Sequence, residues 1–483
     1  MKNPVVTSLE MRRIEELSKL EGCSEEAFMK QAGKNVALHA EKMIQGLEGT
    51  VILLLGKGNK GGDALVAGLS LLEKGISVRA ITITPTKDCS PLQQKFREAF
   101  TNQGGSLQEI DTGLFEDASI LIDGLLGTGF QGEVVGELAA LIRLANQSKK
   151  PILSIDVPSG LDGTTGEVKG DAICATRTVC LGLLKVGLFS NDGWNQVGDL
   201  YLSDFGLPEK YVESAEILAV SPLKTSPPMP FLKRNRHKYE AGYVVGFSGS
   251  KVFKGAPKLA GLSSLRSGSG ITRVFHIGDI GEIPYSLICQ EWEVEAWNAE
   301  LKRADSVFIG PGIGDAKQSF LKKELKGIQV PLVCDADAVQ KELQYPPFTI
   351  LTPHRGEVLR LFGLPKETPE KELFFHAQEW VNVRGCILVV KGAPTWIFAK
   401  ETKPIVCAGG DPGMAVAGSG DVLTGIIASL LAQKVDPLNA AVLGVQLHLF
   451  SGEVASEAKG SYSMIAEDLI EHLPQAVRMC GRT

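Results

Sequence analysis

The chain has 483 residues, 22% of them charged, and a formal net charge of −6. At about 100–200 residues per domain, this length predicts two or three domains, each with its own core. The sequence lacks the basic bias of proteins that bind phosphate backbones, so we expect no nucleic-acid partner. It also lacks a run of about 18 apolar residues that could cross a membrane, and residues 1–20 contain no apolar secretory segment. The nine cysteines include no C-x-x-C pair, which favours free thiols in a cytoplasmic protein over a metal site or a disulfide framework.

Helices and strands alternate through the first half of the chain. Thr7 to Glu10 have the pattern of a capping box, which predicts a helix start, and a second helix is expected over residues 25–47. The apolar run at residues 51–55 ends in glycines, as a strand buried on both faces does. Further strands are predicted over residues 78–83, 120–122 and 151–155, and further helices over 64–74, 92–104 and 135–147. This alternation predicts right-handed βαβ units and a parallel sheet.

A proline-rich segment, which includes residues 226–230, interrupts the pattern and suits a stiff linker. Alternation then resumes, with strands predicted over residues 242–247, 307–309, 332–334, 349–351 and 387–390. We therefore predict an α/β protein with two doubly wound domains, residues 1–215 and 231–483, joined by a linker at residues 216–230.

Three loops of the first half carry polar residues where a buried strand ends. A glycine-rich loop with Asn59 follows the first strand, and Asp123 and Asp156 follow two later strands. In open α/β sheets, ligands bind outside the carboxyl ends of the strands. Each aspartate alone could be a helix cap or a turn residue, but the three loops together predict one ligand crevice.

The motifs around these residues resemble the NAD(P)H-hydrate epimerase domain over about residues 1–215. The resemblance implies a Rossmann-like three-layer sandwich in which Asn59, Asp123 and Ser159 hold K⁺ and Asp156 contacts the reacting end of the substrate. It also implies a substrate site formed by Asn59, Lys60, Gly61, Gly62, Asp63, Gly127, Thr128, Gly129, Phe130, Gln131, Gly132, Glu133 and Asp156. Lys60 stands where the family has asparagine, and its ammonium should repel K⁺ unless the stem carries it outward.

In the second half, the small-residue loop at residues 413–420 precedes Asp421 and an apolar helix predicted over residues 422–431. The start of such a helix stabilises a transferring phosphoryl group, and Asp421 could take a proton from an attacking hydroxyl. A structural alternative is a tight loop in which Asp421 only caps the helix.

The second half also contains Gly-Pro-Gly-Ile-Gly at residues 310–314, Asp-Ala-Asp-Ala at 335–338 and Thr-Pro-His-Arg-Gly-Glu at 352–357. Together with the loop before Asp421, these motifs resemble the ribokinase-like ADP/ATP-dependent NAD(P)H-hydrate dehydratase over about residues 231–478. The resemblance places the hydrate against Gly314, His354 and Asp421, and the nucleotide against Lys391, Gly392, Ala393, Pro394, Thr395 and Gly420. Tyr239 departs from the family's pattern, which has glycine after His237-Lys238.

Both resemblances point to one pathway, the repair of hydrated NADH and NADPH. They imply a cytoplasmic homo-oligomer that interconverts the R and S hydrates and dehydrates the S form with ADP or ATP and Mg²⁺. An alternative is a vitamin-type small-molecule kinase fused to a non-catalytic dinucleotide-binding module, because such kinases share the G-x-G-D loop.

Overall fold

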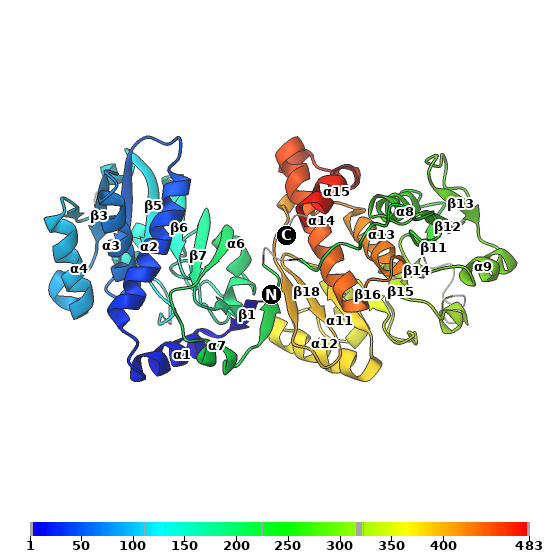
Figure 1. Ribbon diagram of the computed structural model, residues 1–483, viewed down its shortest axis with the longest axis horizontal. Coiled ribbons are helices and arrows are strands. Elements are labelled where there is room, and N and C mark those ends of the chain that lie inside the picture. Colours follow the sequence, from blue (N-terminus) through cyan, green and yellow to red (C-terminus); the bar gives the residue numbers. More distant parts are fainter. Residues whose placement is uncertain are drawn as a thin grey trace. The chain divides into compact units, whose positions relative to one another are not determined.

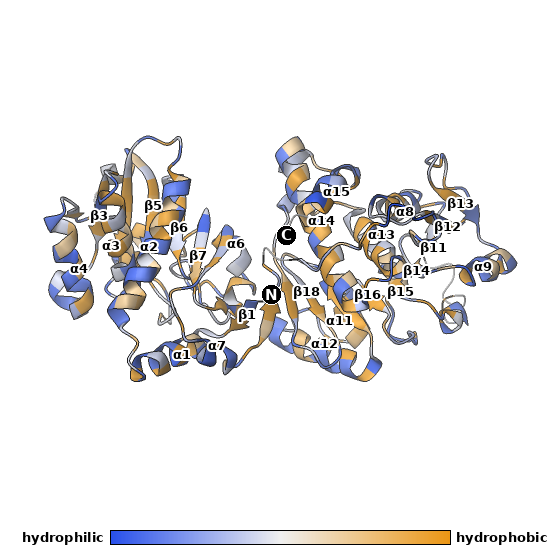
Figure 2. Cartoon of the chain, in the orientation of Figure 1, coloured by the Kyte–Doolittle hydropathy of each residue, from blue (hydrophilic) through white to orange (hydrophobic). Residues whose placement is uncertain are grey.

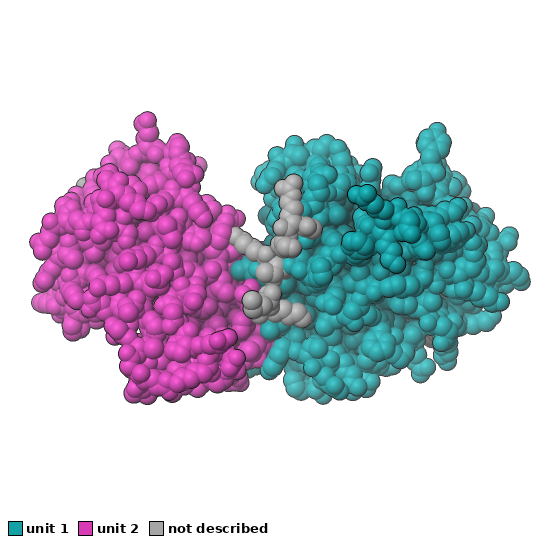
Figure 3. All heavy atoms as spheres, viewed as in Figure 1, with its two compact units in different colours: residues 1–2, 220–483 teal, residues 3–219 magenta. Residues whose placement is uncertain are grey.

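The computed structural model describes residues 3–110, 112–130, 132–223, 226–314, 321 and 323–480. The chain divides into two compact units, one formed by residues 3–219 and the other by the chain from Val220 onward (Figure 3). We call them the N-terminal and C-terminal units.

The N-terminal unit is built on a parallel sheet with the strand order β4-β3-β2-β5-β6-β7-β9. Its strands are β2 (Thr50–Leu55), β3 (Val78–Thr82), β4 (Ser106–Gln108), β5 (Ala118–Gly124), β6 (Ile152–Ile155), β7 (Arg177–Leu181) and β9 (Asp199–Ser203). The chain enters at β2, runs outward to β4 and then returns to the other side of β2 with β5. This reversal creates a switch point between β2 and β5, where open α/β sheets bind ligands.

Helices cover both faces of this sheet (Figure 1). Alternate residues of β2 explain why: Val51, Leu53 and Leu55 pack with residues of α2, α3 and α4, whereas Ile52 and Leu54 pack with residues of α5. The helices are α1 (Ser8–Leu20), α2 (Glu25–Met43), α3 (Asn59–Leu72), α4 (Pro91–Asn102), α5 (Gly136–Gln147), α6 (Gly193–Val197) and α7 (Glu209–Glu213), with 3₁₀ turns at Thr86–Asp88, Thr112–Phe115 and Val186–Leu188. A further short parallel pair joins β1 (Asn3–Val6) to β8 (Leu184–Lys185).

The C-terminal unit has the strand order β13-β12-β11-β14-β15-β16-β17-β18-β19. These strands are β11 (Tyr243–Ser250), β12 (Ile271–Ile277), β13 (Ile288–Glu291), β14 (Ser306–Ile309), β15 (Leu332–Cys334), β16 (Ile350–Leu351), β17 (Ile387–Val390), β18 (Thr395–Phe398) and β19 (Ile405–Cys407). Pairing is parallel from β13 to β17 and antiparallel from β17 to β19. The short strand β10 (Ala219–Ser221) joins β19 through Val220 and Ile405.

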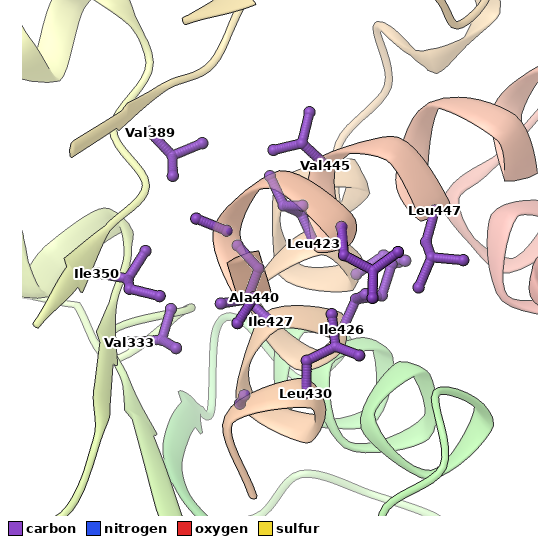
Figure 4. Packing of buried hydrophobic residues seen from close by; sticks show 14 of the residues in the cluster. Val333, Ile350, Val389, Leu423, Ile426, Ile427, Leu430, Ala440, Val445 and Leu447 are labelled. Atoms are coloured by element: carbon purple, nitrogen blue, oxygen red, sulfur yellow. The ribbon is translucent and has the colours of Figure 1, made fainter. Parts of the chain in front are cut away.

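The core of the C-terminal unit surrounds α13 (Ser419–Ala432), which is buried from Val422 to its end. Figure 4 shows its Leu423, Ile426 and Ile427 among residues of α14 (Pro437–Lys459) and of the sheet. On the opposite face of the sheet, Trp297 of α9 (Val294–Leu301) packs edge-on against Phe247 and Phe275. The other helices are α8 (Ala256–Arg266), α11 (Arg355–Phe362), α12 (Glu370–Arg384) and α15 (Ala466–Cys480), with 3₁₀ turns at Leu325–Gly327, Ala336–Ala338, Pro412–Met414 and Ser461–Ser463. In both units, hydrophobic residues gather on the strands and on the helix faces that meet them (Figure 2).

The α/β class and the two doubly wound sheets agree with the prediction. The helix expected to begin at residue 64 is wrong at its start, because α3 begins at Asn59 and includes most of the glycine-rich loop in its first turns. The segment expected to be a linker contains β10. No helix in the described ranges is long and apolar enough to cross a membrane.

Candidate functional site

A cavity of about 560 Å³ lies at the carboxyl ends of β2, β5 and β6 in the N-terminal unit. The predicted residues that line it are Asn59, Lys60, Asp63, Gly127, Thr128, Gly129, Phe130 and Asp156, and helices α1 and α2 add further residues, among them Glu15 and Glu25. The predicted residues Gly132 and Glu133 are exposed and do not line it, and Gln131 lies outside the described residues. The switch point of the sheet therefore holds a cavity that most of the predicted substrate residues share.

The two glycines of the first turn of α3 serve close packing. A Cβ atom at Gly61 would lie 2.4 Å from the carbonyl oxygen of Gly56, and one at Gly62 would lie 2.4 Å from the sulfur of Met29. The contact of Gly61 with a backbone oxygen leaves no room for a side chain, whereas at Gly62 the flexible Met29 side chain would have to move. Neither glycine lines the cavity.

Lys60, the second residue of α3, points inward. Its side chain is 7% exposed, and its Nζ donates hydrogen bonds to the carbonyl oxygens of Ile155 and Val157, the latter at 2.9 Å. Burial lowers the pKa of Lys60, and the nearby carboxylates of Asp156 and Asp123 oppose this effect. The stem does not carry the ammonium outward; it places the ammonium within a cluster of carboxylates.

Asp156 follows β6 in a left-handed backbone conformation, with φ of 66°. Such a conformation in a residue other than glycine costs of order 1–3 kcal/mol and persists where the surroundings enforce it. The carboxylate of Asp156 pairs with the buried ammonium of Lys185 and accepts a hydrogen bond from the amide of Leu181 at 3.1 Å. Although burial alone would raise the pKa of Asp156, the ammonium groups of Lys185 and Lys60 hold it below the usual value.

Two further acids of the cavity are shifted in the opposite direction. Burial raises the pKa of Glu15, on α1, to about 7, and it raises the pKa of Asp63 well above its usual value. The cavity thus combines an ionised carboxylate, Asp156, with one acid, Glu15, whose pKa is about 7 and a second, Asp63, whose pKa is raised by burial. Pairs of acids with separated pKa values are the usual arrangement for general acid–base catalysis.

Two of the three predicted K⁺ ligands lie together. The carboxylate of Asp123 is fully buried and accepts hydrogen bonds from the hydroxyl of Ser159 at 2.5 Å, the hydroxyl of Ser154 at 2.9 Å, and the amides of Ser159 and Leu125 at 2.9 and 3.2 Å. The side chain of Asn59 instead donates to Glu25 at 2.9 Å. Hard cations are held by oxygen ligands. Because Asn59 is turned to Glu25 and the ammonium charge of Lys60 already acts on Asp123, this donor set does not fit K⁺.

In the C-terminal unit, Asp421 lies in the first turn of α13, after Gly418, whose φ of 92° begins the helix. Burial, the nearby Asp335 carboxylate and Asp337 raise the pKa of Asp421 to about 7, against the opposing effect of Lys391. A carboxylate with this pKa accepts a proton efficiently at neutral pH.

A buried ion pair supports the start of α13. Lys391 Nζ lies 2.6 Å from Asp335 Oδ1, and the hydroxyl of Thr424 donates to Asp335 Oδ2 at 3.0 Å. A Cβ atom at Gly420 would lie 3.0 Å from Lys391 Nζ and 3.5 Å from Asp335 Oδ2. Glycine at this position therefore lets the ion pair approach the first turn of the helix.

Gly314 and His354 link the loops at the ends of neighbouring strands, since Gly314 bonds to the loop after β15 and His354 forms a parallel bridge with Lys391. The amide of Gly314 donates to Asp337 at 2.8 Å, and Nδ1 of His354 accepts hydrogen bonds from the amides of Gly356 and Glu357 at 3.0 and 3.3 Å, which caps α11. Because Nδ1 of the His354 ring accepts, its Nε2 carries the proton. The side chain of His354 is 57% exposed, and its Nε2 lies 3.5 Å from Glu357 Oε1.

Of the predicted nucleotide residues, Lys391 to Pro394 form the turn between β17 and β18, Thr395 begins β18, and Gly420 lies in α13. Gly392 and Ala393 are exposed there, whereas Pro394 and Thr395 are buried, and the hydroxyl of Thr395 donates to the carbonyl oxygen of Gly392 at 3.0 Å. The exposed part of this turn follows Lys391, so it lies close to the ion pair with Asp335.

Each unit is a doubly wound α/β sheet with a cluster of acids and a lysine at the carboxyl ends of its parallel strands. Such a fold with such sites defines a two-domain α/β enzyme.

Comparison with known proteins gives the family. The family model described as NAD(P)H-hydrate dehydratase matches residues 244–475, and the one described as YjeF-related protein N-terminus matches residues 25–187. The bifunctional NAD(P)H-hydrate repair enzyme Nnr of Moorella thermoacetica is 31% identical over 98% of this chain and 96% of its own length. The enzyme of the same name from Escherichia coli is 31% identical over 88% of this chain and 84% of its own length. A crystal structure of the ADP/ATP-dependent NAD(P)H-hydrate dehydratase of Bacillus subtilis with ATP and Mg²⁺ is 26% identical, with a TM-score of 0.48, over 52% of this chain and 94% of that chain.

The chain belongs to the family of bifunctional NAD(P)H-hydrate repair enzymes. The family predicted from the motifs is thereby confirmed, and the alternative of a vitamin-type kinase fused to a binding module is not favoured. Sequence reasoning gave no role to Glu15, Lys185 or Asp335. Asp335 directly follows a buried strand, and Lys185 ends an apolar run, so both positions carried a signal.

Proposed function

We propose that the N-terminal unit interconverts the R and S forms of hydrated NADH and NADPH in the cavity at the ends of β2, β5 and β6. Asp156 is ionised through its pairing with Lys185 and acts at the hydrated ring as the base. Glu15, whose pKa is raised to about 7, lines the same cavity and acts as the matching acid. The separated pKa values of these two acids support the assignment.

We propose that the C-terminal unit dehydrates the S hydrate with ADP or ATP. Asp421 takes the proton of the ring hydroxyl, whose oxygen attacks the terminal phosphoryl group. A new O–P bond forms, and the bond to the leaving nucleotide breaks, which gives AMP from ADP. Loss of phosphate, with a proton from the adjacent carbon, restores the ring double bond.

The observation that supports this mechanism best is the position of Asp421. It lies in the first turn of a buried helix, where backbone amides stabilise developing negative charge. Lys391, with the exposed turn that follows it, is assigned to the nucleotide, and Gly314 and His354 to the hydrate. Mg²⁺ fits as a companion of the nucleotide, because it binds mainly through phosphate oxygens and one or two carboxylates.

The test is to incubate pure protein with mixed hydrate epimers and ADP or ATP while following the absorbance of reduced nicotinamide. We expect complete recovery of both epimers, with one phosphate released for each hydrate. Recovery of only one epimer would exclude the proposed epimerase activity. Accumulation of a stable phosphoester would indicate a kinase instead of a dehydratase.

We also propose that the functional boundary lies in residues 216–230 and that the protein is a cytoplasmic homo-oligomer. Light scattering of the purified chain tests the oligomer.

A further inference from the structure

Lys60 lies near the residues to which the family resemblance assigns a potassium ion, because its charge acts on Asp123, one of the three implied ligands. Its Nζ is held by the carbonyl oxygens of Ile155 and Val157, which flank Asp156 in the chain. Carbonyl oxygens of this kind are ligands for a cation and acceptors for an ammonium group alike.

The lysine is held firmly in this position. Its side chain is 7% exposed, and its stem lies against Gly127, where a Cβ atom would be 3.4 Å from Lys60 Cγ. Gly127 lines the same cavity as Lys60. Because Gly127 has no side chain, the stem of Lys60 packs against it and the cavity stays open.

Two positive charges already lie in this buried site. The ammonium groups of Lys60 and Lys185 face the carboxylates of Asp156 and Asp123. A bound K⁺ would add a third positive charge beside them, and like charges brought together in a buried site repel each other strongly.

We propose that the ammonium of Lys60 is a built-in cation that takes the place of K⁺, so that the N-terminal unit of this protein works without a monovalent metal ion. The same ammonium also binds the carbonyl oxygens of the residues on both sides of Asp156. These two hydrogen bonds hold the backbone of Asp156 in its left-handed conformation and so fix the position of its carboxylate. This inference rests on the proposed epimerase function.

The experiment compares the full chain in KCl and in tetramethylammonium chloride at equal ionic strength. Two quantities are measured: the rate at which a single hydrate epimer is converted to the other, followed by chromatography, and the melting temperature. For the wild type we expect the rate to change by less than about twofold and the melting temperature to stay constant, because no cation binds the native state.

Lys60→Asn restores an oxygen ligand and removes the ammonium. In tetramethylammonium we expect it to lose epimerisation by at least about tenfold, as a misplaced reacting group does. Added K⁺ should restore the rate with saturation, and at about 100 times its Kd it should raise the melting temperature of this unit by about 5–10 °C. Lys60→Met, which offers no oxygen, should lose the rate without rescue by K⁺.

Lys87→Asn is the control, because Lys87 is an exposed lysine of the same unit that does not line the cavity. It should remain insensitive to K⁺. The thermal unfolding transition of the N-terminal unit reports whether that unit is folded in each variant, and the dehydratase rate on the S hydrate shows that the C-terminal unit is unaffected.

A wild type whose melting temperature or epimerisation rate rises with saturation in K⁺ would overturn the proposal. So would a folded Lys60→Asn variant that K⁺ neither stabilises nor reactivates. If the wild type epimerises in neither salt, the epimerase function fails, while the melting temperatures still test whether Lys60 replaces the ion.

Discussion

Replacing Asp421 with asparagine should separate activity from stability in the C-terminal unit. The change removes the proposed base but keeps the size of the side chain and the first turn of α13. Loss of a general base typically lowers the rate by about 10²–10⁴-fold. We expect dehydration of the S hydrate to fall by this factor while nucleotide binding is kept, because Lys391 and Gly420 remain.

The same variant should be more stable than the wild type at neutral pH. An acid whose pKa rises from 3.8 in the unfolded chain to about 7 in the folded one is costly to fold in its ionised form. The shift corresponds to at most about 4 kcal/mol, and we expect about 1–3 kcal/mol because solvent reaches part of the side chain. For a unit of this size, the melting temperature should rise by about 3–8 °C.

The stability gained by Asp421→Asn should increase with pH. The cost of Asp421 is absent below pH 3.8, grows as the pH rises and is complete above about pH 7. The gain in melting temperature should therefore be about twice as large at pH 8 as at pH 5.5.

Calorimetry at the two pH values, together with the dehydration assay, tests both parts. Glu401→Gln, at an exposed position of the same unit, is the control and should change the melting temperature by less than about 1 °C. Near-normal dehydration by Asp421→Asn would exclude Asp421 as the base. An unchanged melting temperature at pH 8 would show that burial of the ionised Asp421 carboxylate does not destabilise the folded protein.

Asp156→Ala should abolish epimerisation, leave dehydration of the S hydrate unchanged and lower the melting temperature of the N-terminal unit, because an unpaired buried Lys185 costs about 3–5 kcal/mol. Adding Lys185→Met should restore the melting temperature but not epimerisation; recovery of the activity would show that the carboxylate is not needed. In the wild type, epimerisation should decline above pH 7 as Glu15, with its pKa of about 7, loses its proton, and Glu15→Gln should be slow and lack this decline. An unaltered pH profile would exclude Glu15 as the acid. A fragment of residues 219–483 and one of residues 231–483 should both dehydrate the S hydrate, but the shorter one should melt several degrees lower because it lacks β10, as thermal unfolding of the two fragments would reveal.

The strands and the residues at their ends could be predicted because buried parallel strands are continuous apolar runs. Residues 51–55 belong to this class, and Asp156 follows β6 as expected, whereas β5 continues through Asp123 to Gly124, two residues beyond the predicted strand end. The first turn of α3 could not be predicted, because Gly61 and Gly62 disfavour a helix locally and only close packing against Gly56 and Met29 explains them. Likewise, β10 lies in a proline-rich segment, and its pairing with β19 is a tertiary contact.

The roles of single polar residues were harder to predict than their positions. Asn59, Asp123 and Ser159 were expected to converge, but Asn59 bonds to Glu25 on α2, a helix whose position the sequence does not give. The direction of Lys60 was likewise open, since a lysine stem can reach outward or inward. Its burial depends on carbonyl oxygens that β6 and its loop provide 95 residues later in the chain.

The pairing of β1 with β8 has a consequence for how the protein is made. Val5 pairs with Leu184, and the carbonyl oxygen of Val5 also accepts a hydrogen bond from the amide of Leu218 at 2.9 Å. At about 5–20 residues per second, the ribosome needs roughly 10–40 s to synthesise the residues between β1 and β8. During that interval β1 lacks β8 as a partner strand, so residues 3–6 of the nascent chain are exposed to chaperones and proteases. The N-terminal unit can close only when synthesis has already reached the start of the C-terminal unit.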